Sequence, residues 1–384
     1  MRFEFATATK IIFGPGALRE IGGLARGFGE RALVVTGRNS RRAEVLLDLL
    51  RAESIAPTPF AVEGEPTLAQ VTQGRLAARK ADCQFVIGLG GGGALDAAKA
   101  IAAMLTNDGE LLDYLEVIGC GQTLTQPAAP CLAIPTTAGT GAEVTRNAVL
   151  ASPAHQVKVS LRSPLLLPRL ALVDPELTLA LPPALTASTG LDALTQLIEP
   201  YVSCRANPVT DALCVEGMRH VAWALRVAWQ DGSHAEAREA MALASLLSGL
   251  ALANAGLGAV HGFAAPIGGR FDAPHGAVCA ALLPHVMAAN LAALRSRASG
   301  GEALARYETV ARCLTGKPDA STDDGRRWVS ELVAGLGIPK LRRYGIGPEH
   351  VGDLVAGAAK ASSMKGNPIV LTAGELAAAL TAAL

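Results

Sequence analysis

Aromatic and charged residues are both scarce in this chain, making up 4% and 18% of its 384 residues. The 34 basic and 34 acidic side chains cancel, and like charges occur at most in adjacent pairs such as Arg41-Arg42 and Arg342-Arg343. A neutral chain without basic runs has no electrostatic footprint for nucleic acid or for an anionic membrane surface. We therefore expect neither partner.

The cysteines show none of the features of a disulfide framework. Their number is odd, they are widely spaced, and no CxxC pair occurs. This pattern is typical of reduced thiols in a cytosolic protein, most of them in the core. The segment Met1–Phe5 alternates and carries charge early, which is not typical of a secretory signal. We expect a cytoplasmic protein with these free thiols: Cys83, Cys120, Cys131, Cys204, Cys214, Cys279 and Cys313.

One uncharged stretch, Ala240 to Val260, is long enough to span a bilayer. Ser245, Asn254 and several glycines interrupt it, so we interpret it as a buried core helix followed by a turn.

The length predicts two domains, and the first half alternates strand-like and helix-like segments. Strands separated by helices predict crossover connections and a parallel sheet. The segment Arg2 to Phe13 is also interpreted as an edge hairpin that could pair with another subunit. The strands are predicted within Lys10–Phe13, Ala32–Thr36, Phe85–Leu89, Cys131–Ile134 and Ala171–Val173, with helices over Arg41–Ala52 and Ala94–Met104.

The sequence after Leu181-Pro182-Pro183 is long helical pattern with short breaks at Gly, Pro or Asn. We therefore place a domain boundary there and predict an α/β domain over residues 1–181 and an all-helical domain over residues 182–384. The predicted helices are Leu191–Glu199, Val209–Val227, Ala235–Ala253, Ala277–Leu294 and Glu302–Leu314.

A glycine-rich loop, Gly88 to Gly93, joins a buried strand to a helix that contains Asp96 and Lys99. Glycines let the backbone approach a ligand, and the helix N-terminus offers N–H groups and a positive dipole end to a phosphate. The loop fits GxGxxG only because glycine fills nearly every position, so a tight strand–helix turn remains the alternative. A second candidate is the Thr- and Gly-rich segment Pro135 to Thr145, which an ordinary capped loop explains equally well.

A carboxylate and two imidazoles form a candidate metal site. Asp192 and Gln196 are spaced i, i+4 and share a helix face, and His261 and His275 follow later in similar Pro- or Val-His-Gly contexts. Such donors suit Zn(II) or Fe(II) and leave a position for a substrate oxygen. Each residue taken alone is more simply explained as an ordinary core or helix-terminus residue.

Taken in order, these segments resemble the iron-containing (group III) alcohol dehydrogenase family over nearly the whole chain. The resemblance implies an N-terminal dinucleotide-binding α/β domain, an all-helical C-terminal domain, and a homodimer or larger assembly. It also implies hydride transfer between a nicotinamide cofactor and a small alcohol or aldehyde, assisted by a divalent metal. It assigns metal binding to Asp192, Gln196, His261 and His275, catalysis to Asp192, His261 and His275, and cofactor binding to Gly91, Gly92, Gly93, Asp96, Thr136, Thr137, Thr140 and Lys158.

Four positions depart from the family pattern. The family usually has serine at the positions of Gly93 and Ala142 and histidine at that of Gln196, and it often has a further histidine at that of Ala265. An amide oxygen is a weaker donor than imidazole, so we expect lower metal affinity or a changed metal preference. The missing histidine leaves water or the cofactor ribose to relay the proton.

The cofactor preference has one local indication, which follows the strand Ala32–Thr36. NAD-preferring members of the family often have aspartate at the position of Gly37, whereas here arginines lie nearby at Arg38, Arg41 and Arg42. An arginine accommodates a 2′-phosphate, so the segment favours NADP, although solvated arginines at a helix start explain it as well.

Three alternative functions stay open. A dehydroquinate synthase-like lyase would need a basic cluster for a phosphorylated substrate, yet Arg270 is the only basic residue between His261 and His275. A metal-free reductase of the maleylacetate reductase type accounts for the two missing histidines but leaves Asp192, His261 and His275 unexplained. A noncatalytic nucleotide-binding dimer is the third.

Overall fold

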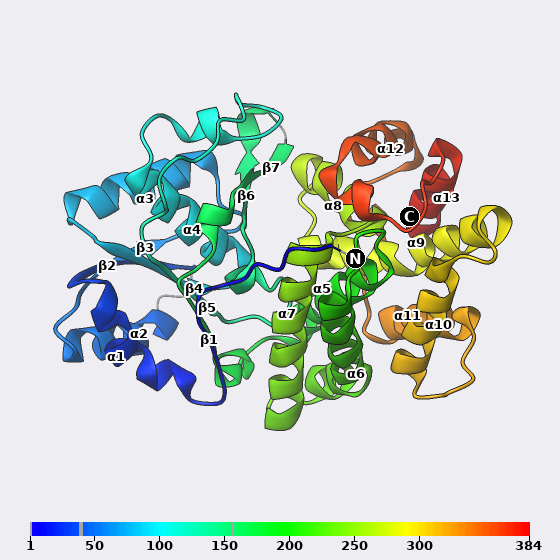
Figure 1. Cartoon of the computed structure of the whole chain (residues 1–384), viewed down its shortest axis with the longest axis horizontal. Helices are drawn as coiled ribbons and strands as arrows, with labels where there is room; N and C mark the ends of the chain where they lie inside the picture. Colours follow the sequence, from blue (N-terminus) through cyan, green and yellow to red (C-terminus); the bar gives the residue numbers. More distant parts are fainter. Residues whose placement is uncertain (1, 38–40, 156) are drawn as a thin grey trace. The chain divides into compact units, whose positions relative to one another are not determined.

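The computed structural model describes residues 2–37, 41–155 and 157–384. Two compact units emerge (Figure 1). The α/β unit comprises Ala6–Thr137 and Gly141–Thr178. The helical unit comprises Leu179–Leu384, the short segment Ala138–Thr140 and the start of the chain up to Phe5.

The α/β unit is built on a six-stranded sheet in the order β1-β8-β5-β4-β2-β3, in which every pairing is parallel. All five predicted strands are present, and the predicted fold class is confirmed. Of the strands in this sheet, β3 is the one that the sequence interpretation lacks, because two prolines break its apolar pattern. It lies at an edge, where proline is tolerated. The strands are β1 (Ile11–Phe13), β2 (Arg31–Thr36), β3 (Ala56–Ala61), β4 (Phe85–Gly90), β5 (Cys131–Pro135) and β8 (Leu170–Val173).

Two apolar clusters cover the two faces of this sheet. One contains side chains of α1 (Ile21–Ala25) and α2 (Arg41–Ala52), and the other contains side chains of α3 (Leu68–Lys80) and α4 (Gly92–Thr106). Helix α4 lies very close to β4, since a Cβ atom at Gly88 would come within 2.8 Å of the Ala98 Cβ. The glycine at that position is therefore required for helix–strand packing.

The predicted N-terminal hairpin is wrong. In the segment Arg2 to Phe13 only Ile11–Phe13 is a strand, and it pairs in parallel with β8 rather than antiparallel with the residues before it. The antiparallel hairpin of the α/β unit lies elsewhere, between β6 (Asn147–Ser152) and β7 (Val157–Arg162). The sheet edge decides this outcome, because β8 offers Ile11–Phe13 a full set of parallel partners.

The helical unit contains no strand from Leu179 to Leu384, as the sequence predicts. Its core is one large apolar cluster, and helix α5 is buried along nearly its whole length. The helices are α5 (Pro183–Val202), α6 (Pro208–Gln230), α7 (Ala235–Ala255), α8 (Ala259–Arg270), α9 (His275–Arg297), α10 (Glu302–Thr315), α11 (Thr322–Gly335), α12 (Val351–Lys360) and α13 (Ala373–Ala383).

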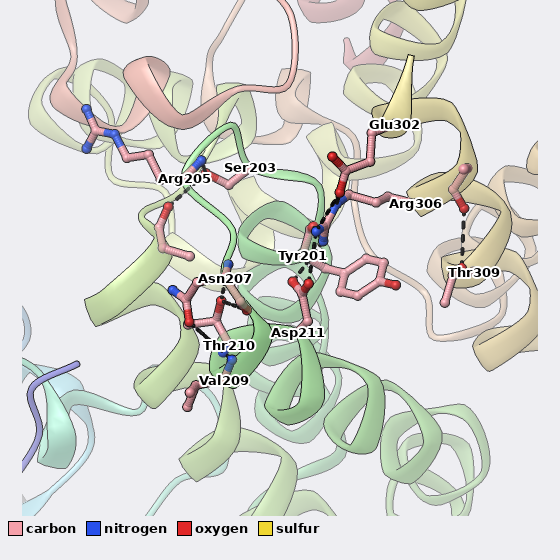
Figure 2. A network of polar contacts seen from close by, with 12 residues as sticks. Tyr201, Ser203, Arg205, Asn207, Val209, Thr210, Asp211, Glu302, Arg306 and Thr309 are labelled. Atoms are coloured by element: carbon pink, nitrogen blue, oxygen red, sulfur yellow. Dashed lines mark hydrogen bonds and ion pairs between the residues drawn. The ribbon is translucent and has the colours of Figure 1, made fainter. Parts of the chain in front are cut away.

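Arg306 ties three of these helices together (Figure 2). From α10 its guanidinium donates to both carboxylate oxygens of Asp211 on α6, at 2.7 and 2.9 Å, and to the Tyr201 carbonyl of α5 at 2.8 Å. It also lies 5.1 Å from the centre of the Tyr201 ring. This bidentate pairing raises the pKa of Arg306 and fixes the relative positions of α5, α6 and α10.

Helix α9 is long and apolar enough to cross a membrane, and so is the pair α7–α8 if it is taken as one broken span. However, 78% of the apolar window of α9 is buried inside the protein, and α7 and α8 meet at a bend of 97°. A mostly buried apolar face and a sharp bend are typical of helices in a protein core.

Candidate active site and metal centre

Three predicted metal ligands and one further residue converge in the helical unit. They are Asp192 of α5, His261 of α8, and His275 and Cys279 of α9, whose donor atoms all lie within 4.8 Å of one another. The Asp192 Oδ1 atom is 3.5 Å from the His261 Nε2 atom and 3.7 Å from the His275 Nε2 atom. The structure thus brings together residues that are up to 87 positions apart.

Glycines allow these helices to approach. A Cβ atom at Gly276, the residue after His275, would lie 2.5 Å from the Ser188 carbonyl oxygen, so only glycine lets the start of α9 pack against α5. Gly256 adopts a φ of 72° in the break between α7 and α8, which gives α8 its direction. His261 lies in the first turn of α8 and His275 begins α9, so both imidazoles sit at helix starts.

The Glu199 carboxylate holds His261 in place. Its Oε2 atom lies 2.7 Å from the His261 Nδ1 atom, and its Oε1 atom accepts from the Val260 N–H at 2.7 Å. Glu199 therefore accepts the Nδ1 proton, and the Nε2 atom, which faces Asp192, is the ring nitrogen that a metal would use, as in carboxylate–histidine–metal triads. The sequence interpretation missed Glu199, although the spacing i, i+4, i+7 of Asp192, Gln196 and Glu199 places all three on one helix face.

Gln196 is held by two hydrogen bonds beside the cluster. Its Nε2 atom donates to the Asp192 Oδ2 atom at 3.2 Å, and its Oε1 atom accepts from the Ser248 hydroxyl at 3.2 Å. A carboxylate only accepts, so the amide nitrogen must face Asp192. In this structure Gln196 orients Asp192.

The electrostatics of the cluster favour a positive charge at its centre. Electrostatic interactions with Cys279 and Asp192 outweigh burial and raise the pKa of His275 to about 9. Burial lowers the pKa of His261, but Cys279 and Glu199 raise it well above its ordinary value. Burial raises the pKa of Asp192, yet the two histidines hold it below its ordinary value. The Asp192 Oδ1 atom is buried without a hydrogen-bond partner. A cation bound by Asp192 and the two histidines would satisfy this oxygen, so the donor set fits a metal ion.

The glycine loop lies at the carboxyl end of β4 and begins α4. Gly91 is the N-cap of this 15-residue helix, and Gly92 and Gly93 are its first two residues, so N–H groups and the positive dipole end are presented there. Gly37 follows the neighbouring strand β2, and its backbone nitrogen lies 3.5 Å from where a Cβ atom on Gly90 would stand. Thr137 lies beside the loop, 3.4 Å from where a Cβ atom on Gly91 would stand.

Asp96 and Lys99 join the two loops that the sequence presents separately. The fully buried Lys99 ammonium pairs with the Asp96 carboxylate at 2.9 Å and donates to the Ala142 carbonyl and the Thr145 hydroxyl. Asp96 also accepts from the Val149 N–H of β6 at 3.0 Å. The sequence interpretation gave Lys99 no role, yet it anchors the segment after Gly141 to helix α4.

The remaining predicted cofactor residues are placed as follows. Thr136 is buried at the end of β5, and Thr140 falls in the short segment that groups with the helical unit. Lys158 of β7 forms an ion pair with Glu65 at 3.0 Å. Arg38 lies outside the described residues.

Two family models match the chain. Residues 8–175 match the model described as iron-containing alcohol dehydrogenase, and residues 186–384 match the C-terminal model of the same family. These two segments include every metal-ligand and cofactor position considered above.

Similar proteins agree with these models. The 1,3-propanediol dehydrogenase of Citrobacter freundii is 38% identical over 357 residues, which cover 90% of this chain and 89% of that one. Alcohol dehydrogenase 4 of Schizosaccharomyces pombe is 35% identical over 97% of this chain and 87% of its own. The crystal structure of a 1,3-propanediol oxidoreductase superposes with a TM-score of 0.93 at 35% identity and covers 100% of both chains. The chain therefore belongs to the iron-containing alcohol dehydrogenase family, and it is a metal-assisted, nicotinamide-dependent oxidoreductase of alcohols or aldehydes.

Proposed function

We propose that this enzyme interconverts small alcohols and aldehydes with NADP(H), using a divalent metal held by Asp192, His261 and His275. The observation that carries the proposal is the convergence of these three side chains around the buried Asp192 Oδ1 atom, which accepts no hydrogen bond and faces both imidazoles. The same observation favours a metal-dependent enzyme over a metal-free reductase, because a buried carboxylate oxygen that accepts no hydrogen bond is costly.

Each residue of the site has a defined task in this proposal. A divalent metal, when bound, polarises the substrate oxygen as a Lewis acid. Asp192 supplies the buried negative charge, and Gln196 orients its carboxylate. Glu199 keeps the Nε2 lone pair of His261 directed inward. His275 contributes the second imidazole from the start of α9.

For the cofactor we propose that Gly91, Gly92 and Gly93 bind the pyrophosphate through backbone N–H groups at the α4 N-terminus. Thr136, Thr137, Thr140 and Lys158 contact the rest of the dinucleotide, and Asp96 stabilises the loop through Lys99. The NADP preference rests on Gly37, which offers the ribose no carboxylate, and on the arginines that follow it in the sequence.

The proton route differs from the family pattern. Ala265 is an exposed methyl group one turn after His261 on α8, and it transfers no proton. We propose that a water molecule or the cofactor ribose completes the relay. Gln196→His leaves this route unchanged, whereas Ala265→His adds a titrating group and shifts the pH profile of kcat.

The decisive test is anaerobic oxidation of NADPH and NADH by Fe(II)- and Zn(II)-loaded enzyme over a panel of small aldehydes and ketones. We expect turnover with at least one aldehyde, faster with NADPH, and its loss in Asp192→Ala. Full activity in Asp192→Ala would refute the metal mechanism. Release of inorganic phosphate from a phosphorylated lyase substrate, with no turnover on the panel, would support the lyase alternative.

We also propose that the enzyme is a homodimer or larger homo-oligomer in the cytoplasm. Strand β1 is at one edge of the sheet and pairs with β8 alone in the part of the chain that the structure describes, which gives a second subunit an edge to bind. All seven cysteines are free thiols, as a reducing cytoplasm would keep them. Light scattering should give a homodimer or larger, and a monomer would contradict this.

A further inference from the structure

We infer that Cys279 is the fourth metal ligand of this enzyme, in place of Gln196. The inference rests on the proposed metal site and changes its composition from an all-oxygen and nitrogen set to one that contains a thiolate. It predicts a metal preference for Zn(II), which thiolate ligands select over harder oxygen-preferring ions.

The position of the thiol carries the inference. The Cys279 Sγ atom is buried, lies 3.8 Å from the His261 Nε2 atom and 3.7 Å from the His275 Nε2 atom, and is within 4.8 Å of the Asp192 donor oxygen. Cys279 follows His275 by four residues on α9, so one helix presents both donors on the same face.

These separations match one ion at the centre of four donors. Zn–S bonds of about 2.3 Å and Zn–N or Zn–O bonds of about 2.0–2.2 Å, at tetrahedral angles, place the ligand atoms about 3.4–3.6 Å apart. The observed separations of 3.5–3.8 Å are close to that spacing before any ion contracts it. The two remaining pairs of donor atoms lie within 4.8 Å of each other, so a bound ion would draw them together.

Gln196 is less suited to the same role. Its Nε2 atom, rather than its oxygen, faces Asp192, so ligation would require the amide to turn and break the hydrogen bond to the Asp192 carboxylate. It is a positioning residue, which holds the Asp192 Oδ2 atom while leaving the Oδ1 atom free. A thiolate one turn after His275 thus compensates for the histidine that is missing at position 196.

The primary test is spectroscopic and uses the full chain. Zn(II) protein is examined by X-ray absorption, and Co(II) protein by its near-ultraviolet spectrum. We expect one sulfur scatterer at about 2.3 Å from zinc and a sulfur-to-cobalt charge-transfer band. A metal-loaded wild-type protein with only nitrogen and oxygen scatterers and no such band would overturn the inference. That result would leave the proposed dehydrogenase function intact, whereas a protein that binds no metal would refute both.

Three variants separate the two candidate ligands. Cys279→Ser should lose the charge-transfer band and weaken Zn(II) binding at least tenfold, measured by chelator competition. Gln196→Ala should keep the band and lose less than tenfold in affinity. Adding Gln196→His to Cys279→Ser should recover affinity without the band. The opposite pattern, with binding lost in Gln196→Ala and kept in Cys279→Ser, would assign the ligand to Gln196.

A matched cysteine controls for folding. Cys214 is buried on α6 in the same helical unit, away from the donor cluster, and Cys214→Ser should keep the band and the affinity. If Cys279→Ser does not fold, as judged by circular dichroism, the X-ray absorption of wild-type protein decides alone.

Discussion

Glu199 and His261 are joined by a 2.7 Å contact between a buried carboxylate oxygen and the imidazole Nδ1 atom, and this contact determines which imidazole nitrogen is available to a metal. The same carboxylate accepts from the Val260 N–H in the first turn of α8, where the helix dipole favours negative charge. One side chain of α5 thus positions both the start of α8 and the ligand that it carries.

Weakening this contact should reduce metal affinity without unfolding the protein. We expect Glu199→Gln to lower Zn(II) affinity about 10–100-fold, since the carboxylate orients the imidazole and increases its basicity. Chelator competition measures the effect. Glu216→Gln removes a carboxylate from an exposed Glu–His pair on α6, 3.3 Å from His220, and should change nothing. Equal affinities in Glu199→Gln and wild type would show that Glu199 has no part in the site.

The cofactor preference should change at one position. An added Cβ atom at Gly37 meets no described atom within 4 Å, so the position has room for a side chain to begin. Its carboxylate should bind the ribose hydroxyls of NADH and repel the 2′-phosphate of NADPH. We expect the ratio of kcat/KM for NADPH over NADH to fall at least tenfold. Gly37→Ala, which adds no charge, is the control, and an unchanged ratio in Gly37→Asp would argue against this ribose contact.

Glu143 should make the folded state sensitive to pH. It is 1% exposed, and burial raises its pKa from 4.5 to about 7, although Lys99 opposes the shift. The folded state then binds this proton more tightly than the unfolded chain does. The free energy of unfolding is therefore highest below pH 4.5 with respect to this group and decreases as the pH rises toward 7.

Removing the charge should abolish this dependence. We expect Glu143→Gln to be more stable than wild type at pH 8 by up to about 3 kcal/mol, and the two to converge near pH 4.5. Urea unfolding at several pH values measures the difference. Glu236→Gln, at an exposed carboxyl, should leave the pH profile as it is. Parallel profiles for Glu143→Gln and wild type would contradict the prediction.

Arg306 should contribute substantially to the stability of the helical unit. Its side chain is 17% exposed, and removing it leaves Asp211 and the Tyr201 carbonyl without their partner. We expect Arg306→Ala to lower the free energy of unfolding by about 2 kcal/mol, between the values typical of exposed and buried pairs. Arg306→Lys should recover less than half, because one ammonium cannot replace a bidentate fork. A loss below 0.5 kcal/mol, roughly that of a surface pair, would contradict this.

Gly93 should resist the serine that its family usually has there. A Cβ atom at this position would lie 2.8 Å from the Gly64 carbonyl oxygen and 3.3 Å from the Pro66 Cδ atom. We expect Gly93→Ser to destabilise the protein by about 1–3 kcal/mol through this overlap. Gly23→Ala, where an added Cβ meets no atom within 4 Å, should not destabilise, and thermal unfolding compares the two. A gain in stability for Gly93→Ser would show that the loop around Gly64 yields easily.

The sequence was sufficient for the fold class and for three of the four donor side chains that the structure brings together. Buried strands such as Phe85–Gly90 are recognisable in the sequence as continuous apolar runs. Asp192, His261 and His275 are recognisable as candidate metal ligands by their residue types and sequence contexts. Strand β3 cannot be recognised in this way, because its prolines and partly exposed positions break the apolar pattern of a buried strand. Local periodicity also suggested a hairpin at the N-terminus, where a long-range parallel pairing with β8 prevails.

Hydrogen bonds and metal-ligand contacts between separate helices could not be predicted from the sequence. Residue types alone determined that this chain carries a glycine-rich loop between a strand and a helix and a set of carboxylate and imidazole side chains, since those properties belong to the residues themselves. Only the tertiary structure decided that Glu199 orients His261, that Gln196 faces Asp192 and that Cys279 reaches both imidazoles. Hydrogen bonds and metal coordination act over about 2–4 Å, and distances of that size between separate helices are set by how the helices pack.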